Sequence, residues 1–398
     1  MYYLFLKSAL HSNTDILESK CNSFFSYFKE QTGIDCNPAS PEKVCEEPVS
    51  IVYIATGGTA GLFKAAAEHL KAPYILITSG SDNSLSASME ILTWLTDLGK
   101  KAILIHGTKE EMCSSLSSLL LAAQAKQKLS GMRLGIIGAP SDWLISTELD
   151  YSLLNQRLGL EIVQISMAEL LDEISKNSYE ESADTLALMK QDFDPDTLAK
   201  ALEIYGAFSR IVQKHNLQGF TVRCFDLLTS VNNTGCLGLS LLNKAGIYSG
   251  CEGDLPSLIS MVILGEISKQ PVFQCNPSRA NKETNDLILA HCTVPLNMIT
   301  NYYLDTHFES GIGVAIAGEL PSSALTIFKS NKNLNRYFAS KAYLKQNLHE
   351  PDLCRTQISI HCEESLETFF STPVGNHYLV CIGDYSKAIH EFFHLLEQ

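Results

Sequence analysis

The sequence predicts an α/β protein, with two Rossmann-like α/β domains built on parallel sheets and a β-rich, barrel-like C-terminal domain. Two observations carry this prediction. Over about the first 300 residues, short apolar runs alternate with longer helical patterns, which is typical of parallel sheets covered by helices. Beyond about Asn301, apolar runs follow one another with little helix between them, which favours antiparallel strands that close toward a barrel.

The first predicted domain covers residues 1–128. Its predicted strands are the runs YYLFLKSA, VSIVYIATGG, APYILITSG and KKAILIHG, most of which end in Gly or Ser. Helical patterns, among them GLFKAAAEHL and SLSASMEILTWLTDLG, separate these runs. Each run therefore predicts one strand of a parallel sheet that has helices on both faces.

The second predicted domain covers residues 129–300, and the third covers residues 301–398. The segment MRLGIIGAPSDWLIS begins the second domain, and later strands are expected at LEIVQIS, GFTVRCFD, GIYSGCEGD, QPVFQCNP and LILAHCTVP. The third domain is expected to contain the strands GIGVAIAGEL, ALTIFKS, RTQISIHCE and HYLVCIGDY. A last helix is expected from Tyr385 onward.

Composition excludes several functional classes. The 398 residues are 45% hydrophobic and 19% charged with a net charge of −14, and no basic stripe is present, so we expect no nucleic-acid partner. No run approaches the ~20 apolar residues of a membrane helix, so we expect no membrane partner. The start MYYLFLKSALHSN predicts a strand rather than a signal peptide, because Lys7 interrupts it. The 12 cysteines are scattered without a CxxC pair, which predicts free thiols and a cytoplasmic location.

Polar residues at the ends of predicted strands are the strongest site candidates, because ligands of open α/β sheets bind beyond the carboxyl ends of the strands. Asp226 ends RCFD, and both Glu252 and Asp254 lie in GCEGD. His291 lies in LAHC, and His377 enters a predicted strand after the Gly-Asn turn of PVGNHYLV. Carboxylates and imidazoles suit Mn²⁺ or Mg²⁺, and neighbouring carboxylates repel one another without a cation. The pattern therefore predicts a divalent metal site.

Several of these residues also have a purely structural interpretation. Asp254 suits the N-cap of a helix, since a Pro follows in the first turn. Glu252 is alternatively a solvated carboxylate, and His291 either supports the site or is a buried core histidine. Three cysteines beside the predicted site are interpreted as small hydrophobic residues, because no base is paired with them: Cys224, Cys251 and Cys292.

Three further motifs have weaker functional interpretations. HEFFH, from His390 to His394, matches the HExxH pattern of zinc proteases, but no third ligand follows, so an amphipathic helix is favoured. ATGGTAG fits neither common nucleotide-binding fingerprint and is expected to be a tight turn or part of a sugar-facing rim. GAPSDWL places Ser141 and Trp143 at a strand end, where the indole would either stack on a sugar or fill the core.

Four segments in one order resemble the C-terminal half of the L-fucose isomerase-like and L-arabinose isomerase-like sugar isomerases. The segments are TVRCFDLL, GCLGLSLLNKAGIYSGCEGDLPSLISMVILGEISKQPVFQCNPS, LILAHCTVP and GNHYLVCIGDY. The resemblance covers roughly residues 219–398, while the N-terminal half is similar only in its α/β pattern. It implies two α/β domains followed by a β-rich domain, which agrees with the three predicted parts.

The resemblance also implies a set of site residues. Asp226, where fucose-type members have Glu, and Asp254 would be the two carboxylate ligands of one Mn²⁺-type ion, with Mg²⁺ or Co²⁺ as alternatives. His377 would complete the coordination, and Glu252 competes with Asp254 as second carboxylate. Asp226 and Asp254 would also act as the catalytic acid and base. The residues expected to contact the substrate are Ser141, Trp143, His291 and Asn376.

The predicted function is a metal-dependent aldose–ketose isomerase that acts on a monosaccharide through an enediol. The alternative is a non-catalytic sugar-binding or regulatory protein that keeps the same fold. An NAD-dependent dehydrogenase is disfavoured because the dinucleotide fingerprint is missing. The resemblance further implies a homo-oligomer, either a trimer or a hexamer, in which residues near ATGGTAG or TSGSDNS cover the active site of a neighbouring subunit.

Overall fold

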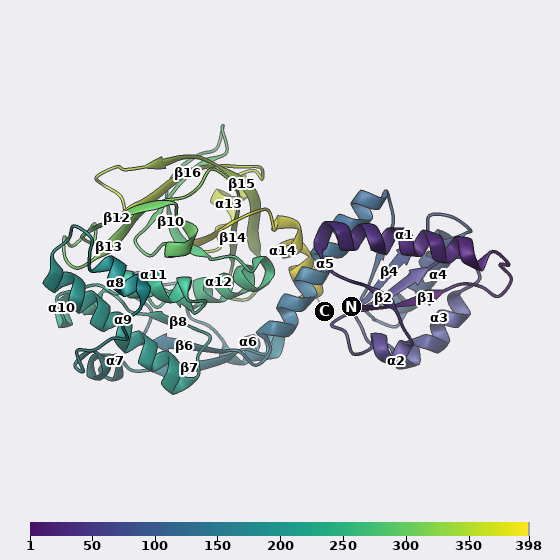
Figure 1. Ribbon diagram of the computed structural model, residues 1–398, viewed down its shortest axis with the longest axis horizontal. Helices are drawn as coiled ribbons and strands as arrows, with labels where there is room; N and C mark the ends of the chain where they lie inside the picture. The colour runs from purple at the N-terminus through teal and green to yellow at the C-terminus, as the bar shows by residue number, and fades with distance from the viewer. Residues whose placement is uncertain (397–398) are drawn as a thin grey trace. The chain divides into compact units, whose positions relative to one another are not determined.

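The computed structural model describes residues 1–396, which divide into two compact units (Figure 1). The first unit comprises Met1–Gln127 together with the end of the chain from Glu391, and the second comprises Lys128–His390. The second unit contains both a parallel sheet and a barrel. This architecture confirms the predicted fold class, whereas the three predicted domain boundaries stay a prediction.

The first unit is built on a parallel five-stranded sheet in the order β2-β1-β3-β4-β5. Its central strands β3 and β4 are buried along their whole length, as expected of runs without polar alternation. The predicted strands correspond to β1, β3, β4 and β5, and the sequence analysis missed only the two-residue β2 at the edge. The strands are β1 (Tyr2–Leu6), β2 (Asn37–Pro38), β3 (Ser50–Ile54), β4 (Tyr74–Thr78) and β5 (Ala102–Ile105).

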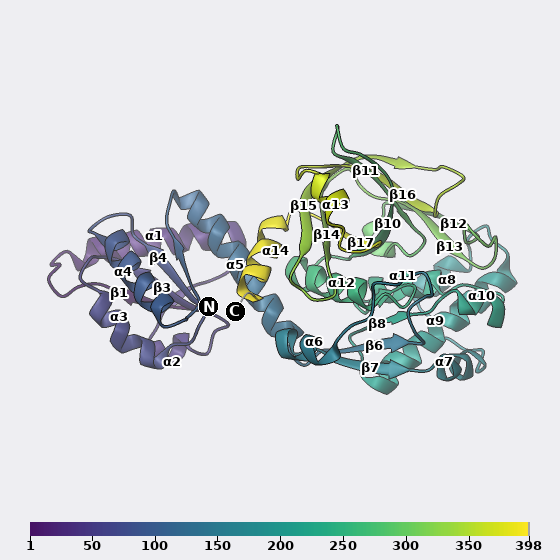
Figure 2. The same cartoon turned by 180° about the vertical axis from the view of Figure 1, so that it is seen from behind.

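Helices cover both faces of this sheet, as Figure 2 shows from the opposite side to Figure 1. The ATGGTAG motif forms the turn between β3 and α3, which is one of the two structures predicted for it. The helices are α1 (Thr14–Thr32), α2 (Pro41–Val44), α3 (Ala60–Ala66), the 3₁₀ turn η1 (Ala67–His69), α4 (Ser84–Asp97) and α5 (Lys109–Leu129).

The parallel sheet of the second unit has the strand order β7-β6-β8-β9. Its strands are β6 (Arg133–Ile137), β7 (Glu161–Ile165), β8 (Gly219–Val222) and β9 (Tyr248–Gly250). Its helices are α6 (Tyr151–Leu158), α7 (Met167–Ile174), α8 (Ala183–Leu188), α9 (Pro195–His215), α10 (Asp226–Ser230), α11 (Cys236–Lys244) and α12 (Leu255–Ser268). Every residue of α12 is buried, because this helix packs against β8 and β9 on one side and against β14 and β17 on the other.

The barrel closes through six antiparallel strands in the order β10-β11-β16-β15-β14-β17, and β12 and β13 form a separate ribbon. The strands are β10 (Phe273–Asn281), β11 (Asp286–His291), β12 (Asn301–Asp305), β13 (Ala315–Glu319), β14 (Ala324–Ser330), β15 (Tyr337–Leu348), β16 (Thr356–Cys362) and β17 (Tyr378–Ile382). The remaining short elements are η2 (Leu296–Met298), α13 (Glu367–Ser371) and α14 (Ser386–Leu396).

The barrel corrects one expectation about strands. The runs QPVFQCNP and LILAHCTVP were expected to continue the parallel sheet, but they form β10 and β11 of the barrel. Only a short turn separates these two strands, and a parallel pair needs a crossover of about a dozen residues. They therefore form an antiparallel hairpin, in which Asn276 pairs with Ala290.

Within the described part of the chain, no helix combines the length and the apolar character needed to cross a membrane. The terminal helix α14 is amphipathic, as predicted for HEFFH. Its apolar residues Phe392 and Leu395 are buried, whereas His390 binds the Tyr337 hydroxyl through Nδ1 at 2.8 Å. His394 instead lies 3.5 Å from the Glu391 carboxylate.

Candidate metal centre

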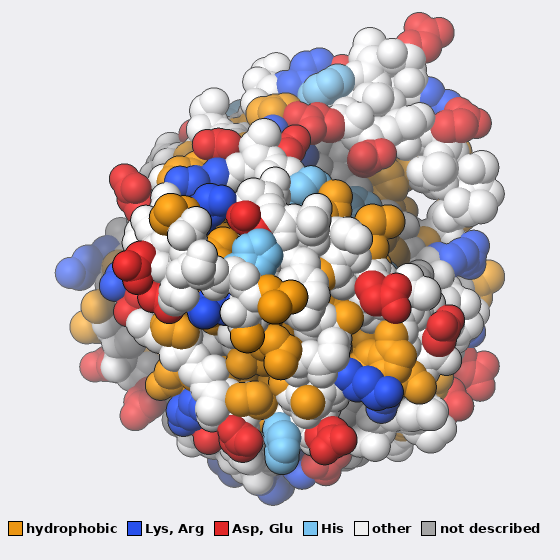
Figure 3. Space-filling model, turned by 90° about the vertical axis from the view of Figure 1, so that its right-hand side faces the viewer, with side chains coloured by type: hydrophobic (Ala, Val, Ile, Leu, Met, Phe, Trp, Pro, Cys, Tyr) orange, Lys and Arg blue, Asp and Glu red, His pale blue; other side chains and the backbone are white. Residues whose placement is uncertain are grey.

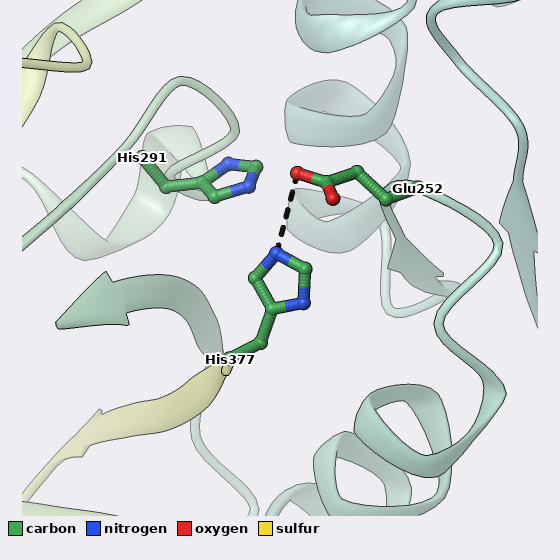
Figure 4. Close-up of side chains that lie close together, drawn as sticks. All are labelled: Glu252, His291 and His377. Atoms are coloured by element: carbon green, nitrogen blue, oxygen red, sulfur yellow. Dashed lines mark hydrogen bonds and ion pairs between the residues drawn. The ribbon is translucent and has the colours of Figure 1, made fainter. Parts of the chain in front are cut away.

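Glu252, His291 and His377 meet in the second unit, and their ligand atoms all lie within 4.8 Å of one another (Figure 4). All three residues are buried. Glu252 lies between β9 and α12, His291 ends β11, and His377 directly precedes β17. The group therefore joins the edge of the parallel sheet to one end of the barrel.

Strand pairing in the barrel explains how the two histidines meet although they are far apart in the sequence. Strand β10 lies between β11 and β17, with Ala290 paired to Asn276 and Tyr378 paired to Cys275. The histidine beside each of these residues is therefore held at the same end of β10. The two imidazole rings lie edge to face, with their centroids 5.6 Å apart.

An unusual backbone turn presents the carboxylate of Glu252. Glu252 has a φ of 63°, in the left-handed region that non-glycine residues rarely adopt, and its carbonyl accepts a hydrogen bond from Ser141 N at 2.9 Å. Gly253 follows with a φ of 68°, and a Cβ there would lie 2.4 Å from the carbonyl oxygen of Ala139. The glycine thus allows the turn to lie against the loop after β6. This close contact holds the Glu252 side chain in place.

The Glu252 carboxylate has a different neighbour for each oxygen. Trp143 donates its indole N–H to Oε2 at 2.6 Å, and Oε1 lies 3.3 Å from Nε2 of His377. The Trp143 ring in turn packs edge to face on Phe225, with a centroid distance of 4.8 Å. One carboxylate oxygen is therefore held by a protein donor while the other faces the histidines.

Asp254 lies behind His377 and orients its ring. Its Oδ2 accepts from Nδ1 of His377 at 2.7 Å and from the Ser257 hydroxyl at 2.6 Å. Its Oδ1 accepts from the backbone N–H of Ser257 at 2.9 Å, so Asp254 is also the N-cap of α12. Lys329, fully buried on β14, lies 3.9 Å from the same carboxylate. Since Nδ1 of His377 is hydrogen-bonded to Asp254, its other nitrogen, Nε2, is the one that faces Glu252.

The pKa values follow from burial and from these contacts. Burial raises the pKa of Asp254, but the charge of Lys329 and the hydrogen bond from His377 outweigh it and hold this pKa below its usual range. Burial lowers the pKa of His377, but the hydrogen bonds to Asp254 and Glu252 outweigh it and raise the pKa to about 9. Burial, assisted by the charge of His377, lowers the pKa of His291 to about 3. Without a metal ion His291 is therefore a neutral imidazole, whereas His377 carries a proton that a bound cation would have to displace.

A cavity of about 440 Å³ opens beside the group and is lined by Glu252 and His291. Its walls combine aromatic rings with thiols and with a few amide and carboxyl groups, which is the composition of many small-molecule sites. No Lys or Arg is present among the described residues that line the cavity. The lining residues include Trp143, Phe225, Asn276, Ser278, His307, Glu309, Asp352 and Asn376, together with Glu252, His291, Cys224, Cys251, Cys292 and Cys354.

The structure brings together only part of the residues expected from sequence. Glu252, His291 and His377 form the group, and Trp143 and Asn376 lie at its cavity. Asp254 contacts the group only through His377. Ser141 contributes its backbone N–H to the Glu252 turn and does not line the cavity, and its buried hydroxyl has no partner among the described residues.

Asp226 does not join the group. It begins α10 with its side chain 42% exposed, and Oδ1 accepts from Arg223 Nε at 3.0 Å. Arg223 also binds Asp142, so this carboxylate belongs to a surface ion-pair cluster. The assignments of Asp226 and Asp254 as metal ligands and as catalytic residues stay predictions.

Four further residues near the group were not singled out from the sequence. His307, Glu309 and Asp352 line the cavity from the loops around β12 and β16, and Lys329 lies in the apolar run of β14. A lysine within an otherwise buried strand was the one available signal, because such a cation needs a buried anion as its partner.

Comparison with known proteins identifies a distant homologue that is a sugar isomerase. The chain is 20% identical over 288 residues to sulfoquinovose isomerase from Priestia aryabhattai, and equally to that from Priestia megaterium (strain ATCC 12872 / QMB1551). In each case the match covers 67% of this chain and 64% of the relative, so the chain spans less than two thirds of the relatives' length. No protein-family model matches the chain.

Proposed function

We propose that the chain is a metal-dependent sugar isomerase that interconverts an aldose and a ketose through an enediol. The observation that carries this proposal is the buried group of Glu252, His291 and His377 at the head of a cavity large enough for a monosaccharide. The distant similarity to a sugar isomerase supports the same reaction class. The finer fucose- or arabinose-type assignment belongs to this proposal as well.

The donor set of the group fits a divalent ion. One carboxylate and two imidazoles suit Mn²⁺, with Mg²⁺ or Co²⁺ as alternatives, and would leave coordination positions for substrate oxygens. A divalent ion held there would stabilise the negative charge that develops on an enediolate. Asp254 would hold the His377 ring in the tautomer whose Nε2 is a ligand, as carboxylates commonly do for metal-binding histidines.

We assign proton transfer to groups that line the cavity. A base must lie within hydrogen-bond reach of the proton that moves between C2 and C1. Glu252, His307 and Glu309 line the cavity and are candidates, whereas Asp226 and Asp254 do not line it. This proposal therefore moves the acid–base role away from the two aspartates that the resemblance implied.

The lining favours a neutral sugar as substrate. Asn276, Ser278 and Asn376 offer hydrogen-bonding groups for hydroxyls, and the Trp143 ring offers an apolar face. The substrate in the relatives' name carries a sulfonate. Among the described residues the cavity has acidic groups and no Lys or Arg to pair with one, so we propose an uncharged monosaccharide for this chain.

A specific observation keeps the alternative function open. The resemblance implied two carboxylate ligands, whereas the group contains only one, Glu252. A protein that binds a sugar, or a metal and a sugar, without turnover would need no second carboxylate. The alternative is therefore a sugar-binding or regulatory protein with the isomerase fold.

Assembly into a trimer or a hexamer remains part of the proposal. Figure 3 shows the side of the first unit on which α3 and α4 lie in Figure 1, and apolar side chains gather near the centre of that face. Leu62 on α3 is 48% exposed and Met89 on α4 is 56% exposed, and these two helices pack against each other. Light scattering tests the assembly, and a monomer that is fully active would contradict it.

One pair of measurements tests the proposed function. Metal analysis of the purified protein is combined with a ketose assay across a panel of neutral aldoses, in the presence of Mn²⁺, Mg²⁺ or Co²⁺. We expect about one divalent ion per chain, and turnover that is lost in Glu252→Gln. Metal binding without turnover on any sugar would favour the alternative, and no metal binding would refute the proposed centre.

A further inference from the structure

Two cysteine thiols face each other at the wall of the cavity. The Sγ atoms of Cys224 and Cys251 lie 2.9 Å apart, and both residues line the cavity. The residues are 7% and 4% exposed, so the cavity is the route by which a small molecule reaches them. From the sequence both were interpreted as small hydrophobic residues, because no base is paired with them.

The fold holds this thiol pair together. Cys224 follows β8 and Cys251 follows β9, and these neighbouring parallel strands are paired in register at Thr221 and Gly250. The backbone of Cys251 is fixed on both sides: its N–H donates to the Gln274 side chain at 3.0 Å, and its carbonyl accepts from the Thr221 hydroxyl at 3.1 Å. A disulfide needs a sulfur separation of about 2.05 Å, so the sulfur atoms would have to approach by less than about 1 Å.

We propose that Cys224 and Cys251 form a modification site that closes reversibly to a disulfide within the cavity. With hydrogen peroxide as oxidant, one sulfur attacks a peroxide oxygen, which gives a sulfenic acid and one water. The second thiol then attacks the sulfenic sulfur, forms the S–S bond and releases a second water. Two thiols are oxidised and one peroxide is reduced, and a small-molecule thiol reverses the change by exchange. In a reducing compartment the bond would be transient.

Closure of the disulfide acts on the metal centre through the chain itself. Cys251 directly precedes Glu252 in the chain. The left-handed backbone turn at Glu252 holds its carboxylate toward His377. Because hydrogen bonds hold the Cys251 backbone on both sides, we expect that closing the S–S bond strains the adjacent turn and shifts the Glu252 carboxylate. This consequence rests on the proposed function, whereas formation of the disulfide does not depend on it.

The experiment uses the full chain. Reduced protein is treated with a small excess of hydrogen peroxide, and a second sample with oxidised glutathione, before peptide mapping by mass spectrometry without reduction. We expect a peptide pair that joins Cys224 to Cys251, the loss of two free thiols, and full recovery after dithiothreitol. Cys224→Ser and Cys251→Ser should each abolish the cross-link. Cys275→Ser, which removes a buried cysteine on strand β10 of the barrel, should retain it.

A second pair of cysteines at the same cavity could form a competing disulfide. Cys354 packs against the buried cluster that contains Cys292, and both residues also line the cavity. A map that joins Cys292 to Cys354 while Cys224 and Cys251 stay free would overturn the proposal. So would oxidation that stops at a sulfinic acid on either Cys224 or Cys251. The wild-type map decides between these outcomes even if a serine variant fails to fold.

Metal binding provides the second readout. Mn²⁺ titration by calorimetry should show about tenfold weaker binding in the oxidised protein, restored by dithiothreitol. Unchanged affinity with the cross-link present would refute the effect on Glu252. If the cross-link forms but the reduced protein binds no Mn²⁺, the proposed metal centre fails and the modification site stands.

Discussion

Asp254 accepts a hydrogen bond from Nδ1 of His377 at 2.7 Å, on the side of the imidazole opposite the nitrogen that faces Glu252. The family resemblance implies that Asp254 is itself a ligand, and this stays a prediction. In the structure the aspartate lies behind the imidazole, where it also caps α12 and faces the buried Lys329. The first prediction distinguishes these two roles.

Asp254→Asn should weaken Mn²⁺ binding by about 10- to 100-fold, because the orientation of His377 is lost while Glu252 and His291 remain. It should also destabilise the protein by about 3–5 kcal/mol, since Lys329 loses its buried anion. Calorimetric titration and chemical denaturation measure the two effects. Asp226→Asn is the matched control, and its Mn²⁺ affinity should stay within about twofold of wild type. Equal losses in both variants would instead support the ligand pair implied by the resemblance.

Mn²⁺ should stabilise the folded protein, because the group of Glu252 and the two histidines exists only in the native state. At a free Mn²⁺ concentration about 100 times the Kd, the stabilisation should be about 2.7 kcal/mol. Glu252→Gln should remove most of this gain, since the group loses its one carboxylate. Thermal unfolding with Mn²⁺ and with EDTA measures the difference. A melting temperature that is identical in both conditions would argue against a metal centre.

Trp143→Phe should weaken Mn²⁺ binding by about tenfold, because it removes the N–H that Glu252 Oε2 accepts at 2.6 Å while keeping an aromatic ring over Phe225. The chain contains only two Trp residues, so Trp94→Phe is a natural control. Trp94 lies on α4 in the other compact unit and packs on Phe63. If both variants bind Mn²⁺ like wild type, the indole does not position Glu252.

Glu173→Gln should destabilise the second unit in a pH-dependent manner. The carboxylate of Glu173 on α7 accepts hydrogen bonds from Lys176 at 2.7 Å and from Arg210 on α9 at 2.8 Å, and these hold its pKa below the usual value. A depressed pKa contributes stability above the unfolded-state pKa of about 4.3, and this contribution is lost as the pH falls through the folded-state value. We expect a loss of about 2 kcal/mol at pH 7.

Denaturation of wild type and Glu173→Gln between pH 7 and pH 3 checks this prediction. The difference in unfolding free energy should shrink steadily below about pH 4. Glu148→Gln, at an exposed position, serves as the control and should show little difference at any pH. A difference that persists unchanged at pH 3 would mean that the glutamine disturbs packing rather than charge.

The extent to which the site was predictable can be judged from its three members. All three were singled out in the sequence analysis, because each follows or precedes a strand. Their roles were harder to predict. His291 was predicted to contact the substrate, and Glu252 was predicted only as an alternative to Asp254 as the second carboxylate ligand. The sequence cannot tell which of two acids separated by one glycine is the ligand, because the answer depends on which way each side chain points.

The sequence by itself determined the alternation of strands and helices, the change to antiparallel strands in the last part, and the cap at the start of α12. These features are local, because hydrophobic periodicity and capping residues act over a few neighbouring positions. Only the tertiary structure decided that β10 and β11 belong to the barrel, which places His291 beside His377 across β10. It also decided that Glu252 turns into the cavity while Asp254 turns to the helix, because a left-handed backbone conformation between β9 and α12 separates the two side chains.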